Sequence, residues 1–506
     1  MNWTATQEQV WELCAAGDPP TPSGFDNPPD LPLHFSRVRS TKSVLLGEVD
    51  KALPRGLAAA GLCAALLLGW APPSHAAEKA IWGPAGTVAG GGSAFDLYRR
   101  LGVDTAQFHL NFAQTAPVEP ANPRSPDDPA YRWPAAIDQA VREGARTGVQ
   151  VALLVSRSPE WSNGGRSEIW RPRPQAFADF LAAAARRYPT VRRWMIWGEP
   201  NRIAVFRPSG TSAGPKAYAE LLDASYGALK QAAPRNIVIG GMTYTGGGGR
   251  DTTPLRWLRQ MRLPNGRPPR LDWYGHNPFS TRFPDLRDPP IPGGFRDIGD
   301  LDLFSREVAR VYTRPCGPGG RRRCGRPPQL WLSEYTIQSD HGSTSFNAFV
   351  SKKGQAQWLA AAYRAANSLP SVAGLGWAAL EDEPESNLSA NFGLITADGT
   401  RKPSFRAFRR APSRAFRPDV RVRRSIRLDR AARKGISVHV RARSAGRVTA
   451  VLQRRGRHIV RHSATGAASE SGLMLSLRPT RLTRGEYILT VDAPRGERVE
   501  RRLTVR

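Results

Sequence analysis

VQVALLV (149–155), AFADFLAAAARRY (176–188) and RWMIW (193–197) decide the fold, because they predict a strand, a helix and a second strand in that order. The outer segments are short apolar runs, and the middle segment repeats its apolar residues at the i, i+3, i+4 spacing of a helix. This succession predicts parallel strands joined by a helical crossover.

The same alternation continues on both sides of this unit. Helical spacing recurs at 216–233 and 356–369, and apolar strand-like runs recur at 107–112, 236–242, 271–277, 329–335 and 372–380. With one more strand expected near 82–90, residues 80–408 hold eight strands and predict an α/β fold, the (β/α)8 TIM barrel. An open doubly wound sheet is the alternative, disfavoured because no glycine-rich nucleotide fingerprint follows a strand.

A second domain is expected after the Pro- and Arg-rich linker at 409–418. Its segments alternate apolar and polar residues at period two, with turn residues between them. They lie at 419–428, 435–443, 447–455, 472–479, 486–493 and 497–506. This pattern predicts a small all-β, antiparallel and immunoglobulin-like sandwich over residues 415–506.

Most of the net positive charge lies in this C-terminal part. The 506 residues hold 73 Lys+Arg and 43 Asp+Glu, and residues 401–506 hold 29 and 7 of these, which is +22 of the net +30. The Arg residues occupy mostly outward strand positions, where a solvated face also explains them. No zinc-ligand spacing and no phosphate-binding glycine loop occur. We therefore expect weak, salt-sensitive contact with polyanions or a cell wall, and no specific nucleic-acid partner.

Residues 1–77 are expected to form a leader. GLAAAGLCAALLLGWA (56–71) is a short apolar run, preceded by Lys51 and Arg55 and followed by small residues at Ser74 and Ala76. These features predict a secretory signal peptide at about 51–76, and thus a secreted or cell-surface protein without a stable membrane span after cleavage. An uncleaved anchor or a buried helix is the alternative.

The residues before this segment do not fit a signal peptide, which should begin near the N-terminus. We hypothesise that translation starts downstream of Met1, at Val44 or Val49, through a start codon that does not encode Met.

Cys316 and Cys324 flank a Gly/Pro loop. Two cysteines at this spacing can close a small disulfide in an oxidising compartment, which agrees with export. A metal site is disfavoured, because two thiols alone do not complete a tetrahedral set of ligands. We expect no metal and no cofactor.

Two glutamates follow strands of the expected barrel. Strand four ends at WGEPN (197–201) with Glu199, and strand seven ends at WLSEY (331–335) with Glu334. Chemistry in this fold sits at the C-terminal ends of the strands. A lone Glu there is usually solvated, but a Glu on each of these two strands, beside aromatic residues, predicts a pair of acting carboxylates.

Over about residues 85–408 the chain resembles the clan A glycoside hydrolases, and family 39 and family 5-like enzymes most closely. WGEPN is similar to the Asn-Glu-Pro element on strand four of that clan, and Glu334 matches its nucleophile on strand seven. Three further segments resemble the clan in the same order: SPEW (158–161), LDWYGHNPF (271–279) and NFGLITADGTRKPSFRAF (391–408).

The resemblance implies a retaining glycosidase, in which one carboxylic acid protonates the leaving oxygen while a second carboxylate attacks the anomeric carbon. Glu199 is then the acid/base, with a pKa raised by apolar surroundings and by its partner's charge. Glu334 is the nucleophile, kept ionised by hydrogen bonds.

Further sugar contacts are expected from residues near the strand ends. His276 is a candidate to hydrogen-bond Glu334 or a sugar hydroxyl, although a structural His that bonds a backbone carbonyl is the alternative. Trp377, Trp161 and Tyr335 are candidates to stack on a sugar or to line the cleft, and core packing is the alternative for each Trp.

Gly198 departs from the clan pattern, which has Asn directly before the acid/base. That Asn hydrogen-bonds the sugar 2-hydroxyl, a contact that strengthens in the transition state. Either another residue supplies it, with Asn111, Asn277 and Asn201 as candidates, or the enzyme is slow, or the substrate lacks this hydroxyl.

Three functions remain open from the sequence. The leading one is a secreted retaining O-glycosidase that acts on a polysaccharide or glycoconjugate. The second is a non-catalytic carbohydrate-binding barrel at the cell surface, and the third is a polyanion-binding surface protein that acts through its Arg-rich sandwich.

Overall fold

A computed structural model describes residues 77–506 apart from 209–211, 248–249, 317–321, 344–347, 385–389, 414–418, 442–445, 455–461, 469–471, 480–481 and 494–497. The signal segment and the alternative start positions therefore lie outside the described residues, as do residues 414–418 of the linker. No helix among the described residues is both long enough and apolar enough to cross a membrane.

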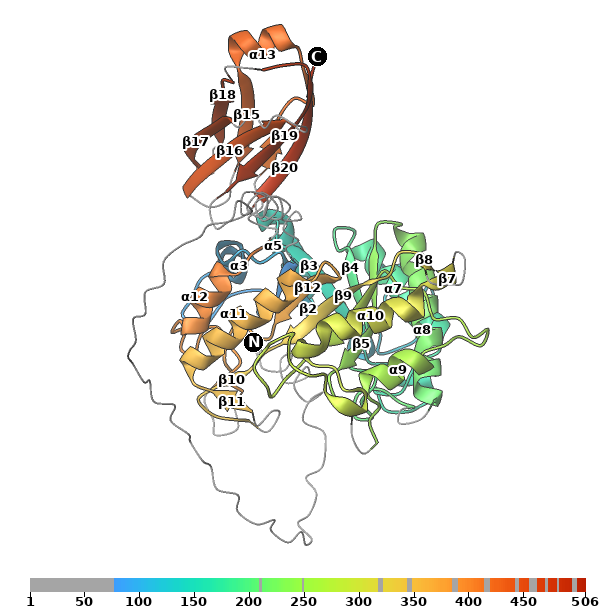
Figure 1. The fold of residues 1–506 in the computed structure, drawn as a ribbon. Coiled ribbons are helices and arrows are strands. Elements are labelled where there is room, and N and C mark those ends of the chain that lie inside the picture. Colours follow the sequence, from blue (N-terminus) through green and yellow to red (C-terminus); the bar gives the residue numbers. More distant parts are fainter. Residues whose placement is uncertain are drawn as a thin grey trace, which may run out of the picture. The chain divides into compact units, whose positions relative to one another are not determined.

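The first described domain is a closed barrel of parallel strands, which confirms the predicted TIM barrel (Figure 1). Its strands neighbour each other in the order β1-β12-β9-β6-β5-β4-β3-β2. They are β1 (Glu78–Trp82), β2 (Thr105–Asn111), β3 (Gln150–Ser156), β4 (Arg193–Ile196), β5 (Ile237–Tyr244), β6 (Trp273–Asn277), β9 (Gln329–Tyr335) and β12 (Val372–Trp377).

The first strand lies earlier than the sequence pattern predicted. It is Glu78–Trp82, and the residues after Trp82 form a loop. The sequence pattern did not predict a strand here, because charged residues such as Glu78 and Lys79 are expected at a solvent-exposed position. Both are buried, with Glu78 bonded to Arg193 and Thr105, and the Lys79 ammonium donating to the backbone oxygen of Phe408.

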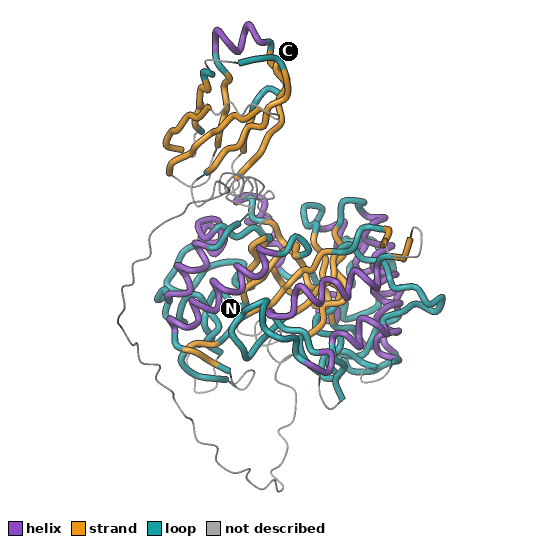
Figure 2. The backbone as a smooth tube through the Cα atoms, viewed as in Figure 1, coloured by secondary structure: helices purple, strands orange, loops and turns teal. Residues whose placement is uncertain are grey.

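Helices surround the barrel strands, as the purple and orange segments of Figure 2 show. They are α3 (Ala94–Leu101), α4 (Phe112–Thr115), α5 (Ala135–Thr147), α6 (Glu160–Asn163), α7 (Pro174–Arg187), α8 (Ala213–Ala232), α9 (Pro254–Gln260), α10 (Leu301–Tyr312), α11 (Lys352–Ser368) and α12 (Pro403–Arg410). Two short 3₁₀ turns (Pro292–Gly294 and Ile298–Asp300) and two small strand pairs lie in the connections; the pairs are β7 (Arg314–Cys316) with β8 (Arg322–Cys324) and β10 (Gln338–Ser339) with β11 (Phe349–Val350).

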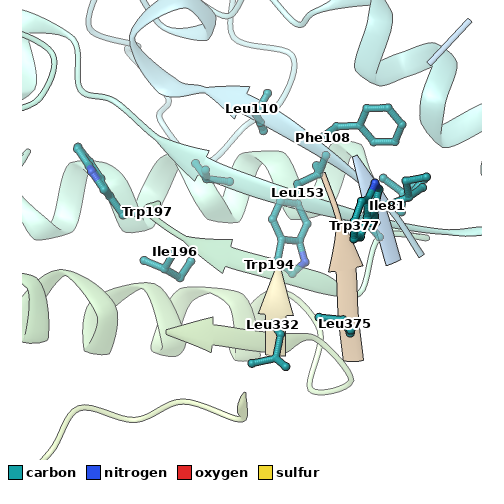
Figure 3. Packing of buried hydrophobic residues seen from close by; sticks show 14 of the residues in the cluster. Ile81, Phe108, Leu110, Leu153, Trp194, Ile196, Trp197, Leu332, Leu375 and Trp377 are labelled. Atoms are coloured by element: carbon teal, nitrogen blue, oxygen red, sulfur yellow. The ribbon is translucent and has the colours of Figure 1, made fainter. Parts of the chain in front are cut away.

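The barrel has two apolar layers, because alternate residues of each strand face opposite sides. On β3, Leu153 belongs to the large cluster shared with the helices, whereas Leu154 belongs to the smaller cluster that includes Met195 and Trp331. Figure 3 shows part of the large cluster, with Trp194 and Ile196 of β4 and Leu332 of β9. This packing fixes the strands, and so fixes where their C-terminal ends lie.

The second described domain is a sandwich of two sheets, in the orders β13-β15-β18 and β14-β20-β19-β16-β17. Its elements are β13 (Asp419–Arg421), β14 (Ser425–Ile426), α13 (Leu428–Lys434), β15 (Ile436–Arg441), β16 (Gly446–Arg454), β17 (His462–Ala468), β18 (Leu473–Leu477), β19 (Gly485–Asp492) and β20 (Arg498–Val505). The predicted all-β sandwich is confirmed, with two differences. β14 pairs with β20 in parallel, and β17 and helix α13 were not predicted.

Candidate active site

Glu199 lies directly after β4, on a backbone turn that few residue types adopt. Trp197 has φ of 60° and Glu199 has φ of 43°, both in the left-handed region. The Glu199 N–H donates to the carbonyl of Met242 at 2.9 Å, at a bulge where β5 has one more residue than β6. Strained backbone of this kind is found mostly at functional sites, where the surrounding structure holds it in place.

Glu334 lies in a second irregularity of the barrel. Leu332 pairs with Leu375 and Tyr335 pairs with Trp377, so β9 has one more residue than β12 over this interval. The Ser333 carbonyl accepts hydrogen bonds from Trp82 Nε1 at 3.0 Å and Gln107 Nε2 at 2.8 Å. Because a bulge re-aims side chains, it separates Glu334 from the regular alternation of β9.

The two carboxyl groups lie close enough to act on each other electrically. Glu199 is 5% exposed and Glu334 is 7% exposed. Burial, and then the charge of Glu199, raise the pKa of Glu334 to about 8, while Arg202 opposes this rise. At neutral pH the pair therefore holds one proton that two carboxyl groups can share.

Glu199 is held at both of its carboxylate oxygens. Arg202 donates to Oε2 at 2.8 Å, in an ion pair whose side chains are only 15% and 7% exposed. Asn277 Nδ2 donates to Oε1 at 3.0 Å, and Asn277 Oδ1 in turn accepts from the Ser333 hydroxyl at 2.6 Å. Asn277 thus connects the end of β6 to both glutamate-bearing strands.

The pKa of Glu334 differs in direction from the sequence-based expectation. Glu199 was expected to hold the proton and Glu334 to be ionised by hydrogen bonds. In the described part of the chain, Glu334 has no hydrogen-bond partner for its carboxyl group, and its pKa is the raised one. The sequence-based expectation left out Arg202, whose positive charge is paired with Glu199 and not with Glu334.

His276 does not contact Glu334. Its Nε2 bonds the carbonyl of Arg296 at 2.8 Å, so this nitrogen carries the proton, and its Nδ1 meets the Thr243 hydroxyl at 2.9 Å. The side chain is fully buried, and burial lowers its pKa to about 4. The structural alternative for His276 is therefore the one that the structure supports.

The three asparagines suggested in place of the missing strand-four Asn have different positions. Asn201 is fully buried, and its side-chain amide forms hydrogen bonds with backbone groups of Tyr244, Gly246 and Thr252. These bonds stabilise the turn that follows Glu199. Asn111 caps α4 through its side-chain oxygen. Only Asn277 contacts one of the two glutamates among these described residues.

The aromatic candidates are mostly packed into the fold. Trp377 is 1% exposed, and its Nε1 donates to the carbonyl of Phe392. Tyr335 is fully buried against Trp377, with no hydrogen-bond partner for its hydroxyl among the described residues. Trp161 is half-buried and donates to the carbonyl of Ala116. Trp161 is therefore the most accessible of the three.

Sequence reasoning missed three residues at the strand ends. Arg202 follows the WGEPN motif directly, so its spacing from Glu199 was a visible signal. His109 of β2 and Ser156 of β3 are bonded to each other at 2.7 Å, and burial lowers the pKa of His109 to about 3. His109 Nδ1 is buried and has no partner in the described part of the chain, so it can donate or accept a further hydrogen bond, according to the tautomer of the ring.

The structure joins Cys316 and Cys324 in a disulfide, with their Cα atoms 5.8 Å apart. Within the described residues, no group of three or more His, Cys, Asp or Glu side chains is placed to hold a metal ion.

Comparison with protein-family models found no match, and neither did comparison with curated proteins. Solved structures that the chain resembles include a family 39 glycoside hydrolase from Bacteroides cellulosilyticus, at 14% identity and TM-score 0.48, covering 80% of this chain and 81% of that one. A glucosidase from Croceicoccus marinus has 14% identity and TM-score 0.47, with 81% and 97% covered. A monomeric beta-xylosidase from Caulobacter crescentus has 15% identity and TM-score 0.45, with 81% and 97% covered. At these values the likenesses carry no weight for function, which rests on the site's own residues.

Proposed function

We propose that this protein is a retaining O-glycosidase that acts on a polysaccharide or glycoconjugate. The observation that carries the proposal is the electrical coupling of two buried carboxyl groups, Glu199 and Glu334, at the C-terminal ends of β4 and β9. A pair of carboxyl groups that shares one proton supplies an acid and a nucleophile at once, as glycoside hydrolysis with retention requires.

In the proposed reaction, Glu199 gives its proton to the leaving glycosidic oxygen while Glu334 attacks the anomeric carbon. The C–O bond to the leaving group breaks and a glycosyl ester of Glu334 forms. Water, deprotonated by Glu199, then attacks the same carbon and releases Glu334. No cofactor is needed to balance either step.

The resting charges require one proton shift before this chemistry. Arg202 stabilises the ionised form of Glu199, and the raised pKa of Glu334 keeps its proton at neutral pH. We propose that a sugar bound between Glu199 and Arg202 weakens their ion pair and frees Glu199 to accept a proton. The proton then moves from Glu334 to Glu199.

Asn277 is proposed to position Glu199 for this transfer. Its amide is fixed by the Ser333 hydroxyl, and its N–H group donates to Glu199. A carboxyl group held at one oxygen keeps the other oxygen at a defined distance from the leaving group, which proton transfer needs.

A non-catalytic glycan-binding barrel is the second candidate, and two observations favour it. Gly198 cannot supply the 2-hydroxyl contact of the strand-four Asn. The pKa of Glu334 is also raised by burial, whereas the first chemical step needs Glu334 ionised.

Export is also part of the proposal. The signal segment predicted at 51–76 has no structural test, and the disulfide between Cys316 and Cys324 supports an oxidising compartment. N-terminal sequencing of the protein from the culture medium should give a first residue close to Ala77. A product that begins at Met1 would contradict both the cleavage and the downstream start.

The direct test is to trap the covalent intermediate. The purified protein and its Glu199→Gln and Glu334→Gln variants are incubated with a panel of aryl glycosides, and then with the 2-fluoro analogue of the best substrate. We expect hydrolysis with retained anomeric configuration, and a glycosyl group on the peptide that contains Glu334. A label on the Glu199 peptide would reverse the two roles, and inverted product would exclude the double displacement. Glycan binding without hydrolysis would favour the second candidate.

A further inference from the structure

The sandwich contains a pocket of about 420 Å³ whose lining is strongly basic. This volume is typical of sites that hold a small molecule or part of a polymer. Its polar lining consists of Arg421, Arg423, Arg430, Lys434, Ser437 and His439, and no acidic residue is among the lining residues that the structure describes.

Three elements bring these side chains together. Arg421 ends β13 and is directly opposite His439 on β15, while Ser437 lies two residues before His439 and so on the same face. Arg430 and Lys434 lie four residues apart on α13, which places both on one side of that helix. The pocket is thus built by the fold rather than by a run of adjacent basic residues.

Part of the positive charge that lines the pocket has no acidic partner among the described residues. Arg423, Arg430 and Lys434 form no ion pair with any acidic residue in the described part of the sandwich. The nearest acid along the chain, Asp429, is instead paired with Arg427 at 3.3 Å and Arg433 at 3.1 Å. Cations gathered without counterions repel each other, and a bound anion would relieve that repulsion.

We propose that this pocket binds an anionic polysaccharide, through the carboxylate, sulfate or phosphate groups that such a chain carries. Guanidinium groups bond anions of this kind with paired N–H donors, and the Ser437 hydroxyl is placed to bond a sugar hydroxyl. The site is separate from Glu199 and Glu334 in the barrel, and the inference does not depend on hydrolysis there.

The shape and chemistry of the pocket favour a glycan over a nucleic acid. Among the described residues that line it there is no Trp, Tyr or Phe, so single-stranded bases have no aromatic surface on which to stack. A duplex backbone would need cations spread along its length. A compact pocket suits one or two charged sugar units instead.

The test measures binding of the full chain to four polymers by affinity electrophoresis: polygalacturonate, dextran sulfate, neutral dextran and duplex DNA. We expect binding to polygalacturonate, dextran sulfate or both, and none to neutral dextran. The first two polymers separate a carboxylate ligand from a sulfate ligand.

A matched pair of double variants locates the site. Arg430→Gln/Lys434→Gln removes two charges inside the pocket, and Arg427→Gln/Arg433→Gln removes two charges from the same helical segment outside it. We expect the pocket variant to weaken binding by roughly tenfold or more, because it removes two charge-assisted contacts. The control variant should change binding less than about twofold. All four positions are exposed, and circular dichroism checks that both variants fold.

Three results would overturn the proposal. Equal weakening by both double variants would show diffuse attraction to the whole basic surface. Binding of duplex DNA that is as tight, and as sensitive to the pocket variant, would make the partner a nucleic acid. Absence of binding to both anionic polymers at low salt would leave the pocket without the ligand proposed.

Discussion

The barrel and the sandwich use arginine in opposite ways. The most buried barrel arginines each bond a carboxylate, and Arg193 with Glu78, Arg296 with Glu307 and Arg202 with Glu199 are ion pairs with side chains 15% exposed or less. Nearly all described sandwich arginines are exposed instead. Charge therefore fixes geometry in the barrel, whereas in the sandwich it is left available to solvent and ligands.

This difference explains why net charge was a poor guide to the candidate active site. The sandwich supplies most of the net charge of the chain, yet its arginines hold little of the fold in place. The barrel is less basic, with 41 Lys+Arg and 28 Asp+Glu over residues 80–408, and its few buried charges form the ion pairs named above and the candidate site. Four predictions test this contrast, from the largest expected effect to the smallest.

Glu334→Gln should abolish hydrolysis. The substitution keeps the shape of the side chain but removes the attacking carboxylate, so kcat should fall by about 10³-fold or more. The folded state should not suffer, because an uncharged amide replaces a buried carboxyl group beside Glu199. Rates on an aryl glycoside and thermal unfolding of the same samples measure both effects. If the variant loses activity only because it unfolds, the assignment of Glu334 as the nucleophile is not supported.

Arg296→Leu should strongly destabilise the barrel. Arg296 bonds both oxygens of the buried Glu307, at 2.8 and 2.7 Å. Its removal leaves an uncompensated charge, which costs about 3–5 kcal/mol of unfolding free energy.

Urea unfolding followed by tryptophan fluorescence reports this change in the barrel alone, because none of the 14 tryptophans lies beyond residue 377. The double variant Arg296→Leu/Glu307→Leu should recover most of the loss. In the sandwich, Arg433→Leu should change calorimetric stability by less than about 0.5 kcal/mol. Equal losses in the two domains would remove the contrast between them.

Gly198→Asn should raise activity if the missing 2-hydroxyl contact limits the enzyme. A Cβ at this position would meet only Leu154, at 3.3 Å, so a side chain can be added with a small shift. We expect roughly a tenfold gain in kcat/KM on substrates with a free 2-hydroxyl.

Two controls separate the hydrogen bond from packing. Gly198→Ala adds the Cβ without the amide, and a 2-deoxy substrate lacks the hydroxyl, so neither should show the gain. If Asn and Ala lower kcat/KM equally, the glycine is needed for its close approach to Leu154, and another group supplies the contact.

Arg202→Gln should move the alkaline limb of the kcat/KM profile to higher pH. Catalysis needs one proton on the glutamate pair, and that proton is lost near the raised pKa of about 8. Arg202 lowers this pKa, so removing its positive charge raises it and extends activity upward by a fraction of a pH unit. Arg202→Lys should keep the limb in place. If the alkaline limb of Arg202→Gln stays in place or moves to lower pH, the charge of Arg202 does not lower the pKa of the glutamate pair.

The sequence predicted the barrel where strands are apolar runs and failed where strand residues are polar. The β3, α7 and β4 unit is visible in its periodicity. β1 was placed too late because Glu78 and Lys79 are buried by partners far away in the chain, such as Phe408 and Arg193. A strand that begins with buried polar residues lacks the apolar pattern from which strands are predicted.

The candidate site divides in the same way. Glu199 and Glu334 could be predicted because each follows the end of an apolar run, and such an end is visible in the sequence. The role of His276 could be given only as an alternative and that of Asn201 could not be predicted, because both side chains bond backbone atoms of loops, such as the carbonyl of Arg296. Arg202 was three residues from Glu199 and was missed only because no spacing rule marks a cation after the motif.

The additional residue in β9 makes the position of Glu334 depend on the number of residues in this strand. This residue offsets an additional residue of β12 between Val372 and Gly374, so loss of one codon between Leu332 and Tyr335 would leave that β12 irregularity uncompensated. The same deletion would remove or redirect the carboxyl group at that strand end. The position of Glu334 is therefore encoded by the length of two neighbouring strands as well as by the residue type, since a one-residue change in either strand would shift the pairing between them.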